Sequence, residues 1–431
     1  MQYEKMVNQS RKKPKAVGID FGTTHTVAST RMESGVQTLV LEKGEQDSFL
    51  MKTLLYFPDR KTSFFGKSAI DEYFDRGMEG RFLQSIKRLL PNPYFTGTSL
   101  FGKHAKIEDL VAIFLREVKI RIESQLGSIQ DVPVVFGKPA RYHHDSSREQ
   151  LGETRFRNAI ELAGFDLNQV SFLEEPVAAS RSSRQGRLSA GQKGPLTLIA
   201  DLGGGTSDYT LFQHQTDHSI KTLAVHGVPL AGDALDSDFF IARLNPYFGS
   251  EIKYQRPLSM NVLTLPTLIL KQLPKWHYHA FLKEPSTWNF ILSLKKEIID
   301  PNQQGILENL ISLIEENLGY KLHRSVETLK IELSEKTDSS FQFKSYPVDI
   351  SFQVKRKDFE SMIEATATKI VDGVLETCKL AQRDPAEVQV LQFTGGTSKI
   401  PLIRNLLTSH FPNARVAEHE TFTAVADGLV S

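Results

Sequence analysis

The sequence lacks the features that mark secreted, membrane-spanning or zinc-cluster proteins. It contains one cysteine, Cys378, so this sequence can form neither an internal disulfide nor a cysteine-rich zinc site. No apolar run reaches the roughly 18 to 20 residues that a membrane-spanning helix needs. The longest candidate, residues 263–270, is interrupted by Pro266. The N-terminus also lacks the apolar stretch of a signal peptide. We therefore expect a cytoplasmic protein with no membrane partner.

An excess of charge of one sign is also missing. The 52 Lys and Arg residues nearly balance 51 Asp and Glu, which gives a net charge of +1. Proteins that bind nucleic acid usually carry a basic field, so we expect no nucleic-acid partner. The basic run at residues 11–15 is interpreted as part of a solvated leader, residues 1–15, with a nucleic-acid or lipid contact as the alternative. The adjacent His143 and His144 suit a surface loop better than a metal site. A monomer is expected.

What the sequence does contain is a repeated strand-and-turn pattern. Residues 16–20 are an apolar run that enters a glycine turn, and the β-prone residues 26–30 follow it. Residues 196–200 and 209–213 flank a second glycine turn about 180 residues later. Each pattern predicts a β-hairpin and not the strand-to-helix order of a dinucleotide fold. The repetition indicates a duplicated architecture with two lobes, in keeping with a length of 431 residues.

The second glycine turn has the chemistry of an anion site. Consecutive glycines leave room for backbone N–H groups to approach phosphate oxygens, because no Cβ intervenes. Flanking carboxylates cannot touch phosphate, but they can hold the water shell of Mg²⁺. A tight turn without a ligand is the alternative for such a motif alone. The turn comprises Gly203, Gly204, Gly205 and Thr206, between Asp201 and Asp208.

The first glycine turn offers the same set of groups, and a third turn follows later. Residues 20–24 supply one acid, one glycine and two hydroxyls, in Asp20, Gly22, Thr23 and Thr24. The third turn, residues 394–397, lies between a predicted strand and a helix that begins near Pro401, where glycine would let the backbone lie flat against a nucleoside. No P-loop, GxGxxG, HExxH or GxSxG motif supports another chemistry.

Apolar periodicity predicts the remaining elements. Helices are expected at residues 111–126, 147–164, 306–318, 323–333 and 358–381. Strands are expected at residues 37–41, 132–137, 170–173 and 388–393, with a strand pair over 341–354 and an exposed loop at 181–195.

The three glycine motifs, in this order, resemble the actin, hexokinase and heat-shock ATPase superfamily. The sequence is most similar to the nucleotide-binding domain of the seventy-kilodalton heat-shock chaperones, the DnaK family, and within it to short YegD-type bacterial homologues. The resemblance covers residues 16–428. It implies an α/β, two-lobed actin-like ATPase fold, with a ribonuclease-H-like mixed sheet flanked by helices and a smaller subdomain in each lobe.

The resemblance also implies domain boundaries. After the flexible leader 1–15, lobe I would span residues 16–193 with its upper subdomain at about 50–130. Lobe II would span 194–410, with its upper subdomain at about 229–340. Residues 411–431 would pack back on lobe I.

The resemblance assigns catalytic roles to four residues. The segment FLQSIKRLL at 82–90 looks like the one that carries the family's catalytic lysine, which implies this role for Lys87. EEPVAA at 174–179 resembles the family's connecting motif and places Glu175 near the attacking water. Thr23 would bind phosphate, and Asp208 would orient water or a second cation, K⁺. The alternatives are a surface lysine, a helix-terminal acid and a turn-stabilising aspartate.

Cofactor contacts follow from the same match. ATP or ADP would bind with Mg²⁺, whose waters Asp20 and Asp201 would hold. Phosphate would contact Gly22, Thr23, Thr24, Gly203, Gly204, Gly205 and Thr206. The nucleoside would contact Gly232, Glu327, Lys330, Gly395, Gly396, Thr397 and Lys399. Departures from the family pattern at Ala231, Ile331 and Phe422 bear on adenosine affinity.

The expected function is slow, Mg²⁺-dependent ATP hydrolysis by a chaperone-like module without a client-binding domain. A co-chaperone or another protein would read the closure of the lobes. Residues 276–278 form either a contact surface or a packed aromatic cluster. Two other functions stay open: a small-molecule kinase of the sugar type, and a non-hydrolysing nucleotide sensor or filament subunit.

Overall fold

The computed structural model describes residues 13–42, 48–139, 145–182, 194–216, 220–417 and 423–431. The chain divides into two compact units. The first unit comprises Met1–Gly227, Val374–Gly395 and His410–Ser431, and the second comprises Val228–Gly373 and Gly396–Ser409. No described helix combines the length and the apolar character that crossing a membrane requires.

The first unit contains a mixed sheet built around the first glycine turn. Its strand order is β11-β10-β1-β2-β3, with β4 also paired to β2. Strand β1 runs parallel to β10 and antiparallel to β2, and β10 runs parallel to β11. The strands are β1 (Ala16–Phe21), β2 (His25–Met32), β3 (Gly35–Thr38), β4 (Met51–Lys52), β10 (Val134–Lys138) and β11 (Val170–Glu174).

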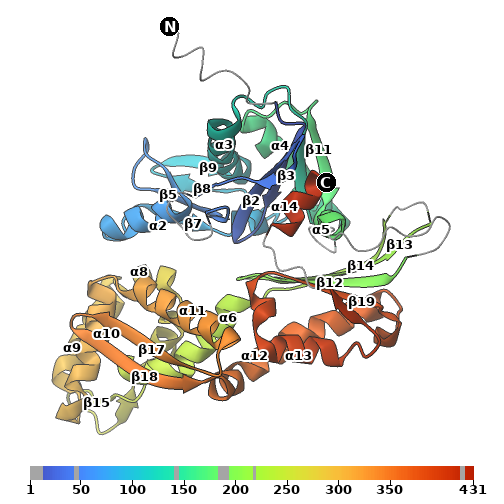
Figure 1. The fold of residues 1–431 in the computed structure, drawn as a ribbon. Helices are drawn as coiled ribbons and strands as arrows, with labels where there is room; N and C mark the ends of the chain where they lie inside the picture. The colour runs from blue at the N-terminus through green and yellow to red at the C-terminus, as the bar shows by residue number, and fades with distance from the viewer. Residues whose placement is uncertain (1–12, 43–47, 140–144, 183–193, 217–219, 418–422) are drawn as a thin grey trace. The chain divides into compact units, whose positions relative to one another are not determined.

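Helices cover both faces of this sheet (Figure 1). On one face, Val17, Ile19 and Phe21 join the hydrophobic core with side chains of α3 (Ile107–Leu126) and α4 (Ser146–Leu162). Burial of this apolar surface is the main driving force that holds the layers together. The other face carries α5 (Glu175–Ser182) and α14 (Ala424–Leu429), which contact each other and β10, and α14 also contacts β1, β2 and β3.

Helix α14 is held on the sheet by polar contacts as well as by packing. The Oδ1 atom of Asp427 accepts hydrogen bonds from Ser29 Oγ at 2.6 Å and Thr38 Oγ1 at 3.1 Å. The helix approaches so closely that a Cβ at Gly428 would overlap the carbonyl oxygen of Ala178 in α5. Glycine is therefore required at this position for the helix to dock.

A second sheet of the first unit repeats the pattern of the first. Its order is β14-β13-β12-β19-β20, in which β12 is antiparallel to β13 and parallel to β19, and β19 is parallel to β20. Both sheets thus combine three parallel strands with an antiparallel hairpin. The strands are β12 (Leu196–Leu202), β13 (Ser207–His214), β14 (Ile220–Val228), β19 (Val390–Thr394) and β20 (Arg415–Ala417).

Smaller elements complete the first unit. Strands β5 (Leu54–Phe57), β6 (Phe64–Phe65) and β7 (Arg81–Gln84) form one sheet, and β8 (Gly97–Leu100) pairs with β9 (Lys103–Lys106). The remaining elements are α2 (Gly66–Asp75) and the 3-10 helices η1 (Ile86–Leu89) and η6 (Pro385–Glu387).

The second unit is mostly helical, with two hairpins. Helix α11 (Gly319–Glu335) packs on β17 (Asp338–Ser345), which pairs with β18 (Val348–Lys355), and β15 (Lys253–Gln255) pairs with β16 (Val262–Thr264). Its other elements are α6 (Gly232–Phe239), η2 (Phe240–Leu244), η3 (Asn245–Phe248), α7 (Thr267–Gln272), η4 (Trp276–Tyr278), α8 (His279–Leu282), α9 (Pro285–Glu297), η5 (Pro301–Gln303), α10 (Gln304–Glu315), η7 (Gly396–Lys399) and α13 (Pro401–Ser409). Helix α12 (Arg356–Leu380) runs from this unit into the first.

The structure confirms the two predicted hairpins and the strand pair over residues 341–354. The strand predicted at 37–41 is wrong in its bounds, because β3 spans Gly35–Thr38. Gly35 has a φ of +126°, a conformation that glycine adopts easily, and the returning strand therefore begins directly at the turn. Helix α10 ends at Glu315, before the predicted residue 318, since Asn317 has a φ of +54°.

Candidate functional site

The buried Lys87 and the half-buried Glu175 form an ion pair in the first unit. Lys87 lies on η1, directly after β7, and its Nζ is 2.7 Å from Glu175 Oε1. The residue Lys87 is only 8% exposed, so the alternative of a surface lysine is wrong. Glu175 is the first residue of α5, where the helix dipole also favours its charge. Burial opposes the charge of Lys87, but Glu175 and Asp20 outweigh it and hold the lysine pKa above its usual range.

Three aspartates join this ion pair at the two glycine turns. Asp20 lies near the end of β1, and Asp201 on β12 is the cross-strand partner of Asp208 on β13. Burial, with the charges of Glu175 and Asp201, raises the pKa of Asp20 to about 8. Desolvation by the surrounding protein and the charge of Asp201 raise the pKa of Asp208 to about 7. Four acidic side chains thus share one lysine, which leaves an excess of negative charge when all are ionised.

Two glycines make room for these carboxylates, and each lies on a strand next to one that carries an aspartate, β10 beside β1 and β14 beside β13. A Cβ on Gly137 of β10 would lie 3.3 Å from Glu175 Cγ and 3.7 Å from Asp20 Oδ1. A Cβ on Gly227 of β14 would lie 2.9 Å from Asp208 Oδ1. Sequence reasoning assigned neither glycine to the site. A glycine within a strand is the signal for such a close approach, although it does not say what approaches.

Both predicted phosphate turns are compact. The N–H of Gly203 donates to the carbonyl of Thr206 at 3.0 Å, which closes the turn between β12 and β13. A Cβ at Gly22 would overlap the carbonyl oxygen of His25, so the first turn also requires glycine. The carbonyl of Gly22 accepts a 2.9 Å hydrogen bond from Thr53 Oγ1. The remaining members of the two turns, Thr23, Thr24, Gly204 and Gly205, lie in these same connections.

The third glycine turn begins at the end of β19. Gly395 has a φ of +78°, and a Cβ there would overlap the carbonyl of Leu202 on β12. Close packing between these strand ends therefore already requires glycine, besides any contact with a nucleoside. The following residues Gly396, Thr397 and Lys399 belong to η7 in the second unit.

The second unit holds a separate cluster of predicted nucleoside-binding residues. Lys330 Nζ is 2.6 Å from Asp236 Oδ2 and donates to the carbonyl of Gly232 at 3.4 Å. Burial disfavours the charge of Lys330, but Asp236 outweighs that effect and raises the lysine pKa. Glu327 pairs with Arg324. Asp236, 4% exposed, was missed by sequence reasoning because an aspartate on α6 gives no sign of its partner on α11.

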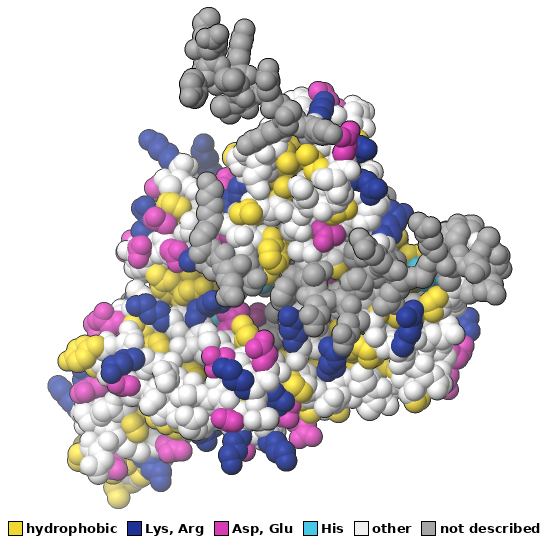
Figure 2. All heavy atoms as spheres, viewed as in Figure 1, with side chains coloured by type: hydrophobic (Ala, Val, Ile, Leu, Met, Phe, Trp, Pro, Cys, Tyr) yellow, Lys and Arg dark blue, Asp and Glu magenta, His cyan; other side chains and the backbone are white. Residues whose placement is uncertain are grey.

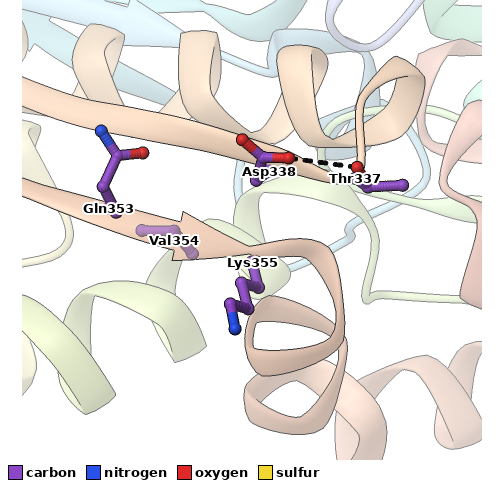
Figure 3. A pocket seen from close by; sticks show the side chains of 5 residues that line it. All are labelled: Thr337, Asp338, Gln353, Val354 and Lys355. Carbon is purple, nitrogen blue, oxygen red and sulfur yellow. Dashed lines mark hydrogen bonds between the residues drawn. The ribbon is translucent and has the colours of Figure 1, made fainter.

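The remaining predictions concern residues that belong to neither cluster. Trp276 is 7% exposed and makes an edge contact with Tyr320 at 5.3 Å between ring centroids, so at this residue the packed alternative holds. A shallow pocket of the second unit contains none of the predicted site residues (Figure 3). It is lined by Thr337, Asp338, Gln353, Val354 and Lys355. His143, His144, Phe422, the leader up to residue 12 and most of loop 181–195 lie outside the described residues.

The first-unit cluster has the chemistry of a site for a hydrated divalent cation. Carboxyl groups with raised pKa values, which are the half-buried Asp20 and Asp201 and the more exposed Asp208, gain from a nearby positive charge. Within the described ranges, no group of three acidic, histidine or cysteine side chains is arranged to hold a metal ion directly. Coordination through water, which Mg²⁺ favours, fits this arrangement. On the face shown in Figure 2, acidic and basic side chains are interspersed.

The chain is similar in sequence to known chaperone proteins. Residues 310–429 match the family model of the Hsp70 protein. The chain is 25% identical over 97% of its length to a chaperone protein DnaK of Thermosipho melanesiensis, and covers 59% of that relative. It is 22% identical over 97% of its length to the DnaK of Thermotoga neapolitana and again covers 59% of the relative. The chain therefore spans about three fifths of the length of these curated relatives.

Two sheets of matching strand order, each with its acidic residues at a glycine turn, define an actin-like ATPase fold. The chain is similar to Hsp70-type chaperones over nearly its whole length at 22% to 25% identity, and residues 310–429 match the Hsp70 family model. The finer resemblance to short YegD-type homologues stays a prediction.

Proposed function

We propose that this chain binds ATP with Mg²⁺ and hydrolyses it slowly to ADP and phosphate. The observation that carries the proposal is the cluster in the first unit, where the buried Lys87 pairs with Glu175 and interacts electrostatically with Asp20, Asp201 and Asp208 beside two glycine turns. Isolated glycine turns bind anions without chemistry. A buried lysine held against a carboxylate is instead suited to stabilise charge and orient water, which is most of what phosphoryl transfer requires.

Each residue of the cluster has a distinct proposed role. Lys87 stabilises the charge of the γ-phosphate, and its ion pair with Glu175 fixes the position of its Nζ atom. Glu175 and Asp208 orient the attacking water, or a second cation such as K⁺. Thr23 and Thr206 donate hydroxyl hydrogen bonds to phosphate oxygens, together with the backbone N–H groups of the glycine turns.

A bound Mg²⁺ ion would neutralise phosphate charge, and Asp20 and Asp201 would hold it through water. The fit rests on the raised pKa values of these two half-buried carboxyl groups and on their places beside the two glycine turns. The nucleoside end is assigned to the other cluster. There Lys330, fixed by Asp236, and Glu327 contact the ribose and base, alongside Gly232 and the third glycine turn.

The proposal also includes a partner protein that senses whether ATP or ADP is bound. In a two-lobed ATPase, loss of the γ-phosphate changes how the lobes grip the nucleotide, and a partner protein can sense that change. A co-chaperone or another protein would be such a partner.

Phosphate release from Mg-ATP tests the proposal. The wild-type protein should hydrolyse ATP at well under about one turnover per second, below typical enzymes. Lys87→Ala and Asp201→Ala should slow this rate further while the protein remains folded, as judged by circular dichroism. Lys344→Ala is the matched control, because the Lys344 side chain is 84% exposed and its ion-pair partner, Asp349, is 60% exposed.

Other outcomes would favour other functions. Normal hydrolysis by Lys87→Ala would overturn the proposed mechanism even if the fold is right. ADP production that depends on an added sugar would favour a small-molecule kinase. ATP-dependent sedimentation with binding but without turnover would favour a sensor or filament subunit.

A further inference from the structure

Arg155 of α4 contacts the turn that carries Lys87. Its Nη1 atom donates to the carbonyl oxygen of Leu90 at 3.1 Å and to that of Asn92 at 2.9 Å. Leu90 directly follows the last residue of η1, and its own N–H donates to the carbonyl of Lys87 at 3.2 Å. One guanidinium group therefore binds the backbone immediately after the turn in which Lys87 lies.

The turn is short and needs external support. Helix η1 has four residues, Ile86–Leu89, and the carbonyl groups at a helix end lack partners within the helix. The preceding Ser85 has a φ of +54°, a left-handed conformation that costs a non-glycine residue energy. Such a turn keeps its shape only when the surrounding structure holds it on both sides.

Arg155 is itself buried, which makes its contacts strong. It is 8% exposed, and its Nε lies 3.7 Å from Glu108 Oε1 on α3. A buried charge persists only when it is paired or hydrogen-bonded, and hydrogen bonds from a charged donor are stronger than neutral ones. The arginine thus joins α3, α4 and the backbone after η1 in one rigid network.

We propose that Arg155 is a positioning residue for Lys87. It fixes the end of η1, and thereby keeps Lys87 Nζ within ion-pair distance of Glu175. Arg155 contacts neither Lys87 nor the acidic cluster through any described side-chain contact, so it acts through the backbone of residues 90–92. Its effect on ATP hydrolysis rests on the proposed function, whereas its effect on Lys87 does not.

Lysine labelling tests the positioning role without any need for activity. The full chain is treated briefly with an amine-reactive reagent, and modification of each lysine is followed by mass spectrometry. Arg155→Gln should raise the labelling rate of Lys87 at least about tenfold, the size expected when a charge-assisted hydrogen bond is lost. Lys138 serves as the internal reference, because its ion pair with Glu153 connects it to the same helix α4.

Arg157→Gln is the matched control variant. Arg157 lies on the same helix and stacks its guanidinium over the ring of Phe172 at 4.9 Å, with an exposed side chain. It should leave the labelling of Lys87 unchanged. Arg155→Lys should give an intermediate rate, because an ammonium group replaces the planar fork but keeps a charged donor.

Two labelling results would overturn the positioning role of Arg155. One is a folded Arg155→Gln protein in which Lys87 is labelled as slowly as in the wild type. The other is an equal rise at Lys87 and Lys138, which would mean that the arginine only stabilises the unit as a whole.

If the wild type hydrolyses ATP, Arg155→Gln should lower kcat about tenfold and change KM less than about threefold. If the wild type has no ATPase activity, the proposed function fails while the labelling result still decides the positioning role.

Discussion

Replacing Asp20 by asparagine should stabilise the nucleotide-free protein. In the folded state, burial and the neighbouring carboxylates raise the pKa of Asp20 from 3.8 to about 8. The folded protein at pH 7.5 must therefore hold a proton on Asp20 that the unfolded chain releases, or keep a negative charge in this half-buried, desolvated position. An uncharged side chain of nearly the same shape removes this conflict.

The size of the effect follows from the two pKa values. A group with a folded pKa near 8 and an unfolded pKa of 3.8 contributes stability that is fully present below pH 3.8 and is lost as pH rises through 8. At pH 7.5 this loss amounts to at most about 5 kcal/mol. The asparagine amide must also find hydrogen-bond partners. We therefore expect Asp20→Asn to gain about 1 to 3 kcal/mol.

Thermal or urea unfolding in EDTA between pH 5 and 8.5 would measure this gain. The difference between Asp20→Asn and wild type should grow as pH rises. In Mg-ATP the order should reverse, because only the wild type can use the carboxylate to hold the hydrated cation. Asp59→Asn is a control of opposite sign: that exposed carboxyl accepts hydrogen bonds from the N–H groups of Lys61 and Thr62, which lower its pKa.

A gain that is the same at pH 5 and pH 8.5 would refute the reasoning. It would show that the asparagine packs better, and that buried charge at residue 20 has no cost. A loss of stability at every pH would mean that the Asp20 carboxylate is needed for folding even without a cation.

Two further predictions concern packing and acid stability. Gly428→Ala should destabilise the protein by more than about 3 kcal/mol in thermal unfolding, because its Cβ would overlap the carbonyl oxygen of Ala178. Gly305→Ala is the control and should be nearly neutral, because the space around its Cβ position is open. Equal effects of the two variants would contradict the docking geometry of α14. His277 and His279 have pKa values lowered to about 4, mainly by burial, so the stability that they support is present above pH 6.5 and is lost as pH falls through 4. Tryptophan fluorescence should follow this acid transition, because both tryptophans lie in the second unit. His279→Gln should make the stability of this unit depend less on pH. An unchanged pH profile would contradict the claim that these histidines cause the acid transition.

Local patterns in the sequence were enough for much of the architecture. An apolar run that enters a glycine turn predicted both hairpins, because alternation and turn chemistry act between near neighbours in the chain. The ends of the elements were predicted less accurately than their existence. The bounds of β3 and α10 depended on left-handed backbone at Gly35 and Asn317, for which a single residue gives only a weak signal.

The site was predicted only in part, since its members come from distant segments. Family resemblance singled out Lys87 and Glu175, but nothing in either segment shows that the lysine is buried or that the two side chains meet at 2.7 Å across 88 positions. The roles of Asp236 and Arg155 had no local signal, because each is defined by a group on another helix or turn. Gly137, a glycine within a strand, signals a close approach but not which group approaches.

The sequence by itself therefore determined the two glycine hairpins, the acidic residues beside them and the family they resemble. Only the tertiary structure decided which charges are buried and which partner each one has. The physical reason is that burial and charge pairing depend on distances through space, which the packing of helices and sheets sets. Turn and strand patterns, in contrast, depend on residues that are adjacent along the chain.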